Sequence, residues 1–84
     1  MYEIIFSNKS KKQLEKLEKP LQKRIIDALE RIRIRPGAHI TKLVGEYGYK
    51  LRVGDYRIIL DLNKTQLLIL IITVGHRKNI YKNL

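Results

Sequence analysis

The 84-residue sequence has no cysteine, no long apolar run and few acidic residues. Without cysteine the chain can form neither a disulfide nor a thiolate metal site, and a reducing cytoplasm is its natural location. The most apolar run, residues 67–74, is far too short to cross a bilayer. Residues 1–10 lack the charged start and long apolar core of a signal peptide. These absences predict a cytoplasmic protein without a membrane segment.

The scarcity of acidic residues leaves a strongly basic chain. Eight Asp and Glu stand against 18 Lys and Arg, which gives a net charge of +10. Such a charge concerns partners rather than fold, and it favours nucleic acid, an anionic membrane surface or an acidic protein. The hydrophobic fraction of 44% is ordinary for a globular protein. We therefore predict a single folded domain over residues 1–84.

Most catalytic constellations are missing as well. His39 and His76 are far apart in the sequence, with neither cysteine nor paired carboxylates nearby, which argues against a metal site. Ser7 and Ser10 lie at the start of a predicted helix, far from His76, so a serine triad is not indicated. The sequence has no glycine-rich loop of the nucleotide-binding type. We predict no metal and no cofactor, and we interpret His39 as a surface residue.

The hydrophobic period divides the chain into two parts. Residues 2–6 read as a strand, and Ser7 can cap the helix that follows. Apolar residues then recur at helical spacing, which predicts a helical hairpin over residues 8–18 and 20–34 that stops at Pro36.

From residue 40 onward the period is two. It predicts an antiparallel meander of three strands, at residues 47–53, 56–62 and 66–74. Gly75 is expected to end the last strand, and residues 76–84 to form a short tail of one or two helical turns. The prediction is an α+β domain whose two helices cover one face of the sheet and leave the other partly open.

Three cations gather on the predicted open face. In the stretch KLRVGDYR the dipeptide Gly-Asp is a two-residue hairpin signal, so Arg52 lies opposite Arg57 with Lys50 beside them. Like charges directly opposite on a sheet are destabilising, and Asp61 further along this face compensates them only in part. The cluster is either a solvated basic surface or an anion site in which guanidinium groups grip phosphate.

RNA cleavage is the chemistry that such a cluster can still perform. RNA supplies its own nucleophile, the 2′-hydroxyl, so a protein needs only proton transfer and cations that stabilise the phosphorane. The segment VGHRKNIY brings further basic and aromatic residues just beyond the third strand, whose end can lie near the same open face.

The motifs YKLRVGDYRIIL and VGHRKNIY, after a strand and a helix pair, resemble the RelE/ParE superfamily of bacterial and archaeal toxins. The resemblance implies a β-α-α-β-β-β fold with a short C-terminal helical tail. Its RelE branch implies a metal-independent, ribosome-dependent endoribonuclease that cuts mRNA in the A site and leaves a 2′,3′-cyclic phosphate (or 3′-phosphate) and a 5′-hydroxyl.

Matching positions assign roles to individual residues. The resemblance implies four catalytic residues, Lys50, Arg57, Arg77 and Tyr81. In that order they act as base or charge stabiliser, as transition-state stabiliser, as phosphate contact or acid, and as the group that orients or stacks the substrate. It also implies RNA or phosphate contacts by Arg52, His76 and Lys78.

One departure from the family pattern keeps other interpretations open. The best-known RelE-type enzymes carry a second lysine where this chain has Gly48, which leaves the general base undecided between Lys50 and His76. The alternatives are a ParE-like DNA gyrase inhibitor without nuclease activity and a catalytically degenerate toxin. The retained basic residues favour the ribonuclease.

The resemblance also implies two partners. One is the ribosome with mRNA in its A site. The other is a cognate antitoxin, expected to be acidic and partly disordered and to bind through an amphipathic helix. That helix would dock on the helix pair or displace the C-terminal tail near Arg77 and Tyr81.

Overall fold

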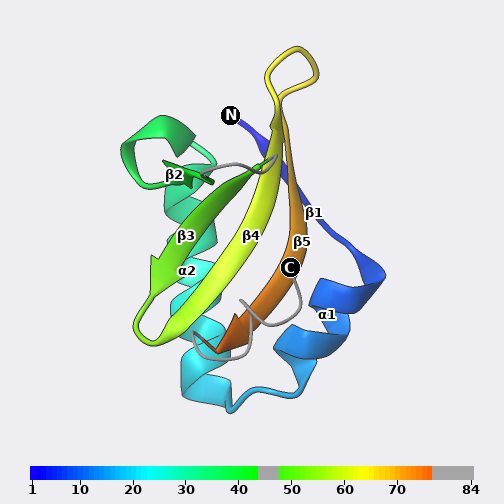
Figure 1. Ribbon diagram of the computed structural model, residues 1–84, viewed down its shortest axis with the longest axis vertical. Coiled ribbons are helices and arrows are strands. Elements are labelled where there is room, and N and C mark those ends of the chain that lie inside the picture. Colours follow the sequence, from blue (N-terminus) through cyan, green and yellow to red (C-terminus); the bar gives the residue numbers. More distant parts are fainter. Residues whose placement is uncertain (44–47, 77–84) are drawn as a thin grey trace.

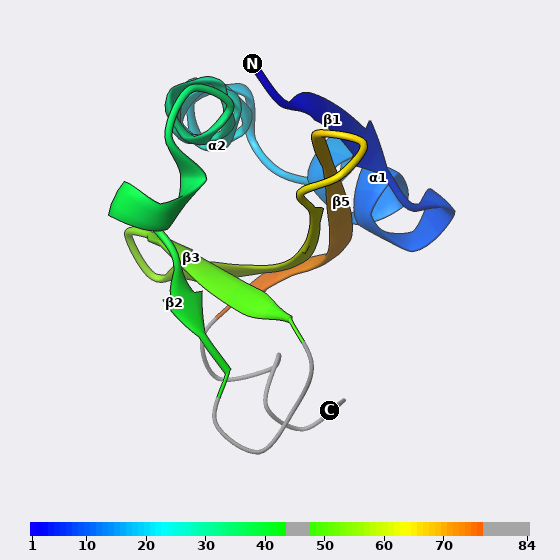
Figure 2. The ribbon, with the colours of Figure 1, turned by 90° about the horizontal axis from the view of Figure 1, so that it is seen from above.

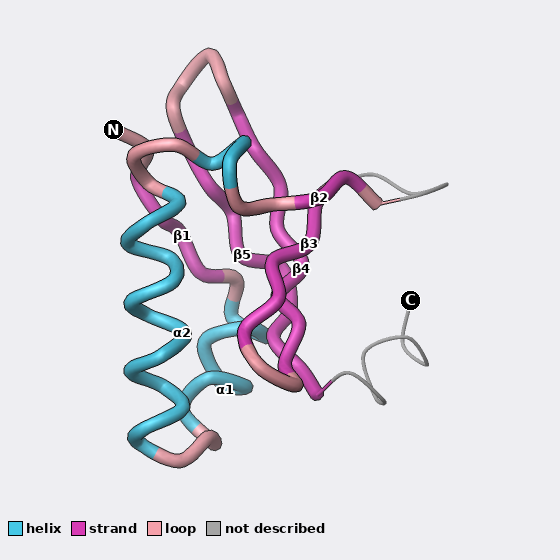
Figure 3. Tube along the Cα trace, turned by 90° about the vertical axis from the view of Figure 1, so that its left-hand side faces the viewer, coloured by secondary structure: helices cyan, strands magenta, loops and turns pink. Residues whose placement is uncertain are grey.

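The computed structural model describes residues 1–43 and 48–76 and forms a helix layer against a sheet (Figures 1 and 3). Its elements are β1 (Glu3–Phe6), α1 (Asn8–Glu15), α2 (Lys19–Ile32), the 3₁₀ turn η1 (Pro36–Ala38), β2 (Thr41–Lys42), β3 (Tyr49–Val53), β4 (Tyr56–Asn63) and β5 (Leu68–His76). The sheet order is β1-β5-β4-β3-β2, with β1 parallel to β5 and the other neighbours antiparallel. The predicted α+β class is confirmed.

Local signals account for the ends of the two helices. Ser7 is the N-cap of α1, and its Oγ accepts the Ser10 N–H at 3.1 Å, as the sequence predicts. Pro20 lies in the first turn of α2, where a missing N–H removes no helical bond. Between the helices, Gln22 Nε2 donates to the Leu17 carbonyl at 2.6 Å. This bond fixes the short connection between α1 and α2.

The sheet departs from the predicted meander in two places. The short strand β2 adds a partner to β3, through the pairs Thr41↔Lys50 and Lys42↔Tyr49. Gly75 does not end β5, which continues to His76 because the ladder with β4 runs on to the Tyr56↔His76 pair. The prediction that the strand stops at Gly75 was therefore wrong, since pairing with β4 decides its length.

Polar side chains of α1 take over the edge of β5 where β1 ends. Helix α1 lies beside β5 beyond the last residue of β1 (Figure 1). Gln13 Oε1 accepts the Val74 N–H at 2.7 Å and the Thr73 hydroxyl at 3.0 Å. The buried Ser10 hydroxyl donates to the Ile71 carbonyl at 2.9 Å. These bonds satisfy backbone groups that would otherwise form an unpaired edge.

The core lies between α2 and the concave face of the curved sheet (Figure 2). Helix α2 contributes one stripe at helical spacing, consisting of Ile25, Ala28, Leu29 and Ile32. The strands contribute Leu51, Val53, Ile58, Leu60, Ile69, Ile71 and Val74. Leu14 of α1 and Leu17, which follows the end of that helix, pack against the same core. No described helix is long and apolar enough to cross a membrane.

Candidate functional site

The β3–β4 hairpin sets the position of the cation cluster. The first residue of the turn, Gly54, has a φ of +59°, whereas the second, Asp55, does not have a positive φ. This combination is typical of a type II′ turn. This two-residue turn pairs Arg52 with Arg57 and Lys50 with Ile59. The predicted register of the hairpin is confirmed.

Lys50, Arg52 and Arg57 meet at one cavity of about 220 Å³, here called the Lys50–Arg57 cavity. Its remaining lining residues are His39, Thr41 and Leu51. Among residues 1–43 and 48–76, no carboxylate lines this cavity. Three cations around one cavity have the composition of an anion site, because guanidinium and ammonium groups are strong donors to phosphate oxygens.

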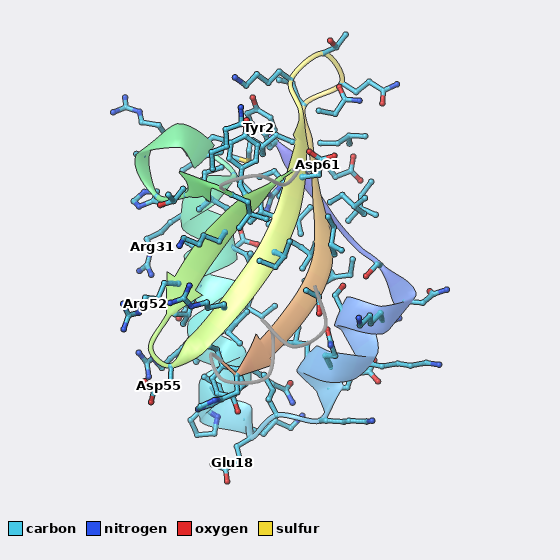
Figure 4. All side chains as sticks on the ribbon, in the orientation of Figure 1. Tyr2, Glu18, Arg31, Arg52, Asp55 and Asp61 are labelled. Carbon is cyan, nitrogen blue, oxygen red and sulfur yellow. The ribbon has the colours of Figure 1, made fainter. Side chains whose placement is uncertain are left out.

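Asp61 is not among the described residues that line the Lys50–Arg57 cavity. Its Oδ1 accepts the N–H of Leu62 at 2.9 Å. In Figure 4 the Asp61 label stands at the opposite end of the sheet from Arg52 and Asp55. Partial compensation of the cluster by Asp61 therefore stays a prediction.

His76 lies on the other face of the sheet from Arg57. It pairs with Tyr56, and the two rings make an edge-to-face contact with centroids 5.4 Å apart. Paired residues project to the same side, and Tyr56 shares its side with buried Ile58. Arg57 pairs with Gly75 and projects to the opposite side. The structure therefore does not bring His76 to the open face, as the sequence interpretation assumed.

Three of the predicted site residues, Arg77, Lys78 and Tyr81, lie outside the described residues. Among residues 1–43 and 48–76 no group of three or more His, Asp or Glu could hold a metal ion. One residue that the sequence interpretation set aside, His39, lines the Lys50–Arg57 cavity. His39 follows η1, and its position near β3 depends on the β2–β3 pairing, which the sequence analysis did not predict.

Gly48 has a structural reason to lack a side chain. Its φ is +101°, and a Cβ there would lie 2.9 Å from the Leu60 carbonyl oxygen. Any L-residue would be strained by the backbone and would push against β4. A lysine could not occupy this position without a shift of the strand, so the departure from the family pattern is built into the entry to β3.

Comparison with known proteins identifies the family. The model of the ParE toxin of the type II toxin–antitoxin system parDE matches residues 4–81. The chain belongs to the RelE/ParE superfamily of type II toxins. The sequence matches no curated protein.

Solved structures of RelE toxins share the fold of this superfamily member. The RelBE2 complex from Mycobacterium tuberculosis matches with a TM-score of 0.82 at 22% identity, over 90% of this chain and 98% of that one. RelE in the RelB–RelE complex from Methanococcus jannaschii gives 0.76 at 28% identity, over 95% and 98%. The isolated Escherichia coli RelE toxin gives 0.79 at 22% identity, over 99% and 94%. The family model carries the ParE name, and these structures carry the RelE name.

Proposed function

We propose that this toxin is a ribosome-dependent endoribonuclease that cuts mRNA in the decoding A site. The observation that supports it is the Lys50–Arg57 cavity, in which three cations meet beside the β3–β4 hairpin and which no carboxylate of the described residues lines. A ParE-like inhibitor that binds protein without chemistry has no need for such a convergence. A phosphodiester in transition does need it, because negative charge develops on its oxygens.

The proposed reaction is an attack of the 2′-oxygen on the adjacent phosphorus. The O2′–P bond forms, the bond from phosphorus to the 5′-oxygen breaks, and the products are a 2′,3′-cyclic phosphate and a 5′-hydroxyl. The 2′-hydroxyl loses a proton to a base, and the leaving 5′-oxygen gains one. In our proposal Lys50 is the base or stabilises charge, and Arg57 stabilises the phosphorane.

The roles that we propose for the C-terminal residues come from the resemblance to the family. Arg77 would contact the phosphate or protonate the leaving oxygen, and Tyr81 would orient or stack a base of the RNA. Arg52 and Lys78 would contact the backbone. We give His76 no part in proton transfer, because its ring packs against Tyr56 on the other face. The ribosome would supply the orientation of the substrate that so few groups cannot impose alone.

A second candidate is a DNA gyrase inhibitor of the ParE type. The observation that favours it is the ParE name of the family model that matches residues 4–81. A third is a degenerate toxin that folds and binds its antitoxin without cutting RNA, for which Gly48 in place of a second lysine is the motivation.

A cognate antitoxin is the proposed protein partner. The Mycobacterium tuberculosis and Methanococcus jannaschii relatives were solved as toxin–antitoxin complexes. For this chain we propose an acidic, partly disordered antitoxin that binds through an amphipathic helix, because its charge would complement a net charge of +10. The helix would dock on α1 and α2 or compete for the segment that carries Arg77 and Tyr81.

Mapping of 5′ ends tests the ribonuclease proposal. The purified toxin is added to translating ribosomes with a defined mRNA, and cuts are expected within the A-site codon. Arg57→Ala and Arg77→Ala should abolish cutting, whereas Arg35→Ala, an exposed arginine outside the Lys50–Arg57 cavity, should not. Intact mRNA with blocked gyrase supercoiling would instead support the second candidate. Intact mRNA with active gyrase would support the third.

A further inference from the structure

A second, larger cavity lies between α2 and the β3–β4 hairpin. Its volume is about 420 Å³, and we call it the α2 cleft. It is lined by Arg24, Asp27, Ala28, Arg31, His39, Leu51, Arg52, Val53 and Gly54. The cleft thus combines one flank of a helix with the end of a hairpin, and three of its lining residues are arginines.

The helix contributes two arginines on the same flank. Arg24 and Arg31 are seven residues apart, which places them two turns and about 10.5 Å apart along the axis of α2. Asp27 lies between them, yet it pairs with neither: in the part of the chain that the structure describes, the ion pair is Arg33 with Glu30 at 2.9 Å. Three arginines against one aspartate leave the cleft with an excess of positive charge.

Arg24 reaches from α2 to the hairpin turn. A Cβ on Gly54 would lie 3.4 and 3.5 Å from the two terminal guanidinium nitrogens of Arg24. The guanidinium of Arg24 therefore lies close beside the hairpin turn. Across the cleft, Arg52 donates from Nε to the Gly54 carbonyl at 3.3 Å, which turns its guanidinium toward the same end. Figure 4 shows Arg31 and Arg52 on one flank of the molecule.

The two cavities are adjacent. His39, Leu51 and Arg52 line both the α2 cleft and the Lys50–Arg57 cavity. A basic path therefore runs from Lys50 and Arg57 past Arg52 to the arginines of α2.

We infer that the α2 cleft is a second phosphate site, which holds the RNA backbone next to the Lys50–Arg57 cavity. The inference rests on the proposed function for its choice of RNA as the ligand, but not on cleavage. An acidic amphipathic helix is the less suitable occupant, because it needs exposed apolar surface. The apolar lining residues Ala28, Leu51 and Val53 are only 4%, 6% and 7% exposed. Guanidinium forks along an extended path suit a phosphodiester backbone.

The salt dependence of RNA binding tests the inference. The probe is a short, fluorescently labelled single-stranded oligoribonucleotide, and affinity is measured across a range of salt concentrations. Each phosphate contact contributes about 0.7 to the slope of log K against log salt. Arg24→Gln with Arg31→Gln should reduce the slope by about 1.4 relative to the wild type. The matched control is Lys9→Gln with Lys12→Gln, two exposed lysines of α1 that line neither cavity.

A substitution that should tighten RNA binding separates the loss of an RNA contact from a folding defect. Asp27→Asn removes the one acid among the described residues that line the cleft and should tighten RNA binding by about two- to fivefold, as expected for a single exposed charge. Equal slopes for the α2 pair and the α1 pair would overturn the inference. So would an unchanged RNA slope with weakened binding of polyglutamate, which would assign the cleft to an acidic protein. A reduced slope together with uncut mRNA on ribosomes would keep the inference and refute the ribonuclease.

Discussion

The two ends of the sheet treat polar groups in opposite ways. At the β1–β5 end, α1 closes the edge with matched partners: Gln13 accepts from Val74 and Thr73, and Ser10 donates to Ile71. At the β3–β4 end, Arg52 is placed directly opposite Arg57, with Lys50 beside the same cavity. At one end the named buried groups have hydrogen-bond partners, and at the other end cations that repel one another are gathered.

The groups that stabilise the fold and the groups that we propose to act on RNA therefore lie in different parts of the sheet. Satisfied buried groups contribute to folding, whereas like charges opposite on a sheet oppose it. Proteins violate local rules of this kind mainly at functional sites. Replacement of Arg52 should therefore weaken RNA binding and leave the free energy of unfolding equal or higher. Substitutions at the α1 edge should lower the free energy of unfolding and leave the action on RNA unchanged.

The largest expected effect is on the rate of cleavage. Arg57→Gln removes a cation that, in the proposed reaction, faces the developing charge of the phosphorane. Loss of one such donor lowers the rate by about 10²–10³-fold. The measurement is the single-turnover rate of A-site cutting on programmed ribosomes.

The matched control for this prediction is Arg35→Gln, which removes the same charge from an exposed position outside both cavities. Its cutting rate should stay within about twofold of the wild type, as for an isolated surface charge. Equal rates for both variants would remove Arg57 from the chemistry and reduce the hairpin cluster to a solvated basic surface.

The next effect is on stability at the opposite end of the sheet. Gln13→Ala leaves the Val74 N–H and the Thr73 hydroxyl without their acceptor, and both residues are buried. An unsatisfied buried group costs about 1–3 kcal/mol, so urea unfolding should shift by that amount. Gln66→Ala, in the exposed β4–β5 turn, is the control. A cutting rate that falls along with stability would contradict the separation of the two ends.

The sequence was sufficient for features set by neighbouring residues. Ser7 predicted the start of α1, and Gly54 with Asp55 predicted the hairpin register, because both signals act over two or three residues. Features set by distant partners were missed. The strand β2 and the passage of β5 through Gly75 depend on pairing with β3 and β4, which no local pattern encodes.

The candidate site divides in the same way. The alternation of residues along the strands was enough to place Lys50 and Arg52 on one face of the sheet, with Arg57 on the same face across from Arg52. His76 was expected in a tail beyond the third strand, whereas it belongs to β5, where its pairing with Tyr56 sets it on the other face from Arg57. The arginines of α2 lie near the hairpin because the helix packs on the sheet. The sequence shows how the arginines are spaced along the helix, but not which strands they face.

Gly48 offers a test at the entry to β3. Gly48→Ala must hold an L-residue at φ +101° with its Cβ 2.9 Å from the Leu60 carbonyl oxygen. Such strain costs about 1–3 kcal/mol, which should appear as a lower midpoint of thermal unfolding. The control is Gly37→Ala, where a Cβ would meet nothing within 4 Å. Equal midpoints would mean that the position tolerates side chains and that the missing family lysine has no structural cause.

The smallest expected effect is a gain in stability from the loss of a cation. Arg52→Gln removes the charge opposite Arg57, and like pairs in this arrangement cost about 0.2–1 kcal/mol. The free energy of unfolding should rise by up to that amount at low salt, and the gain should shrink as salt screens the pair. In a double-mutant cycle with Arg57→Gln, the second substitution should add less than it does alone, because the repulsion is already gone. RNA affinity should fall in the same variant, since Arg52 lines both cavities. A variant that loses stability and keeps its RNA affinity would show that Arg52 supports the hairpin through its bond to Gly54 and is not held there against repulsion.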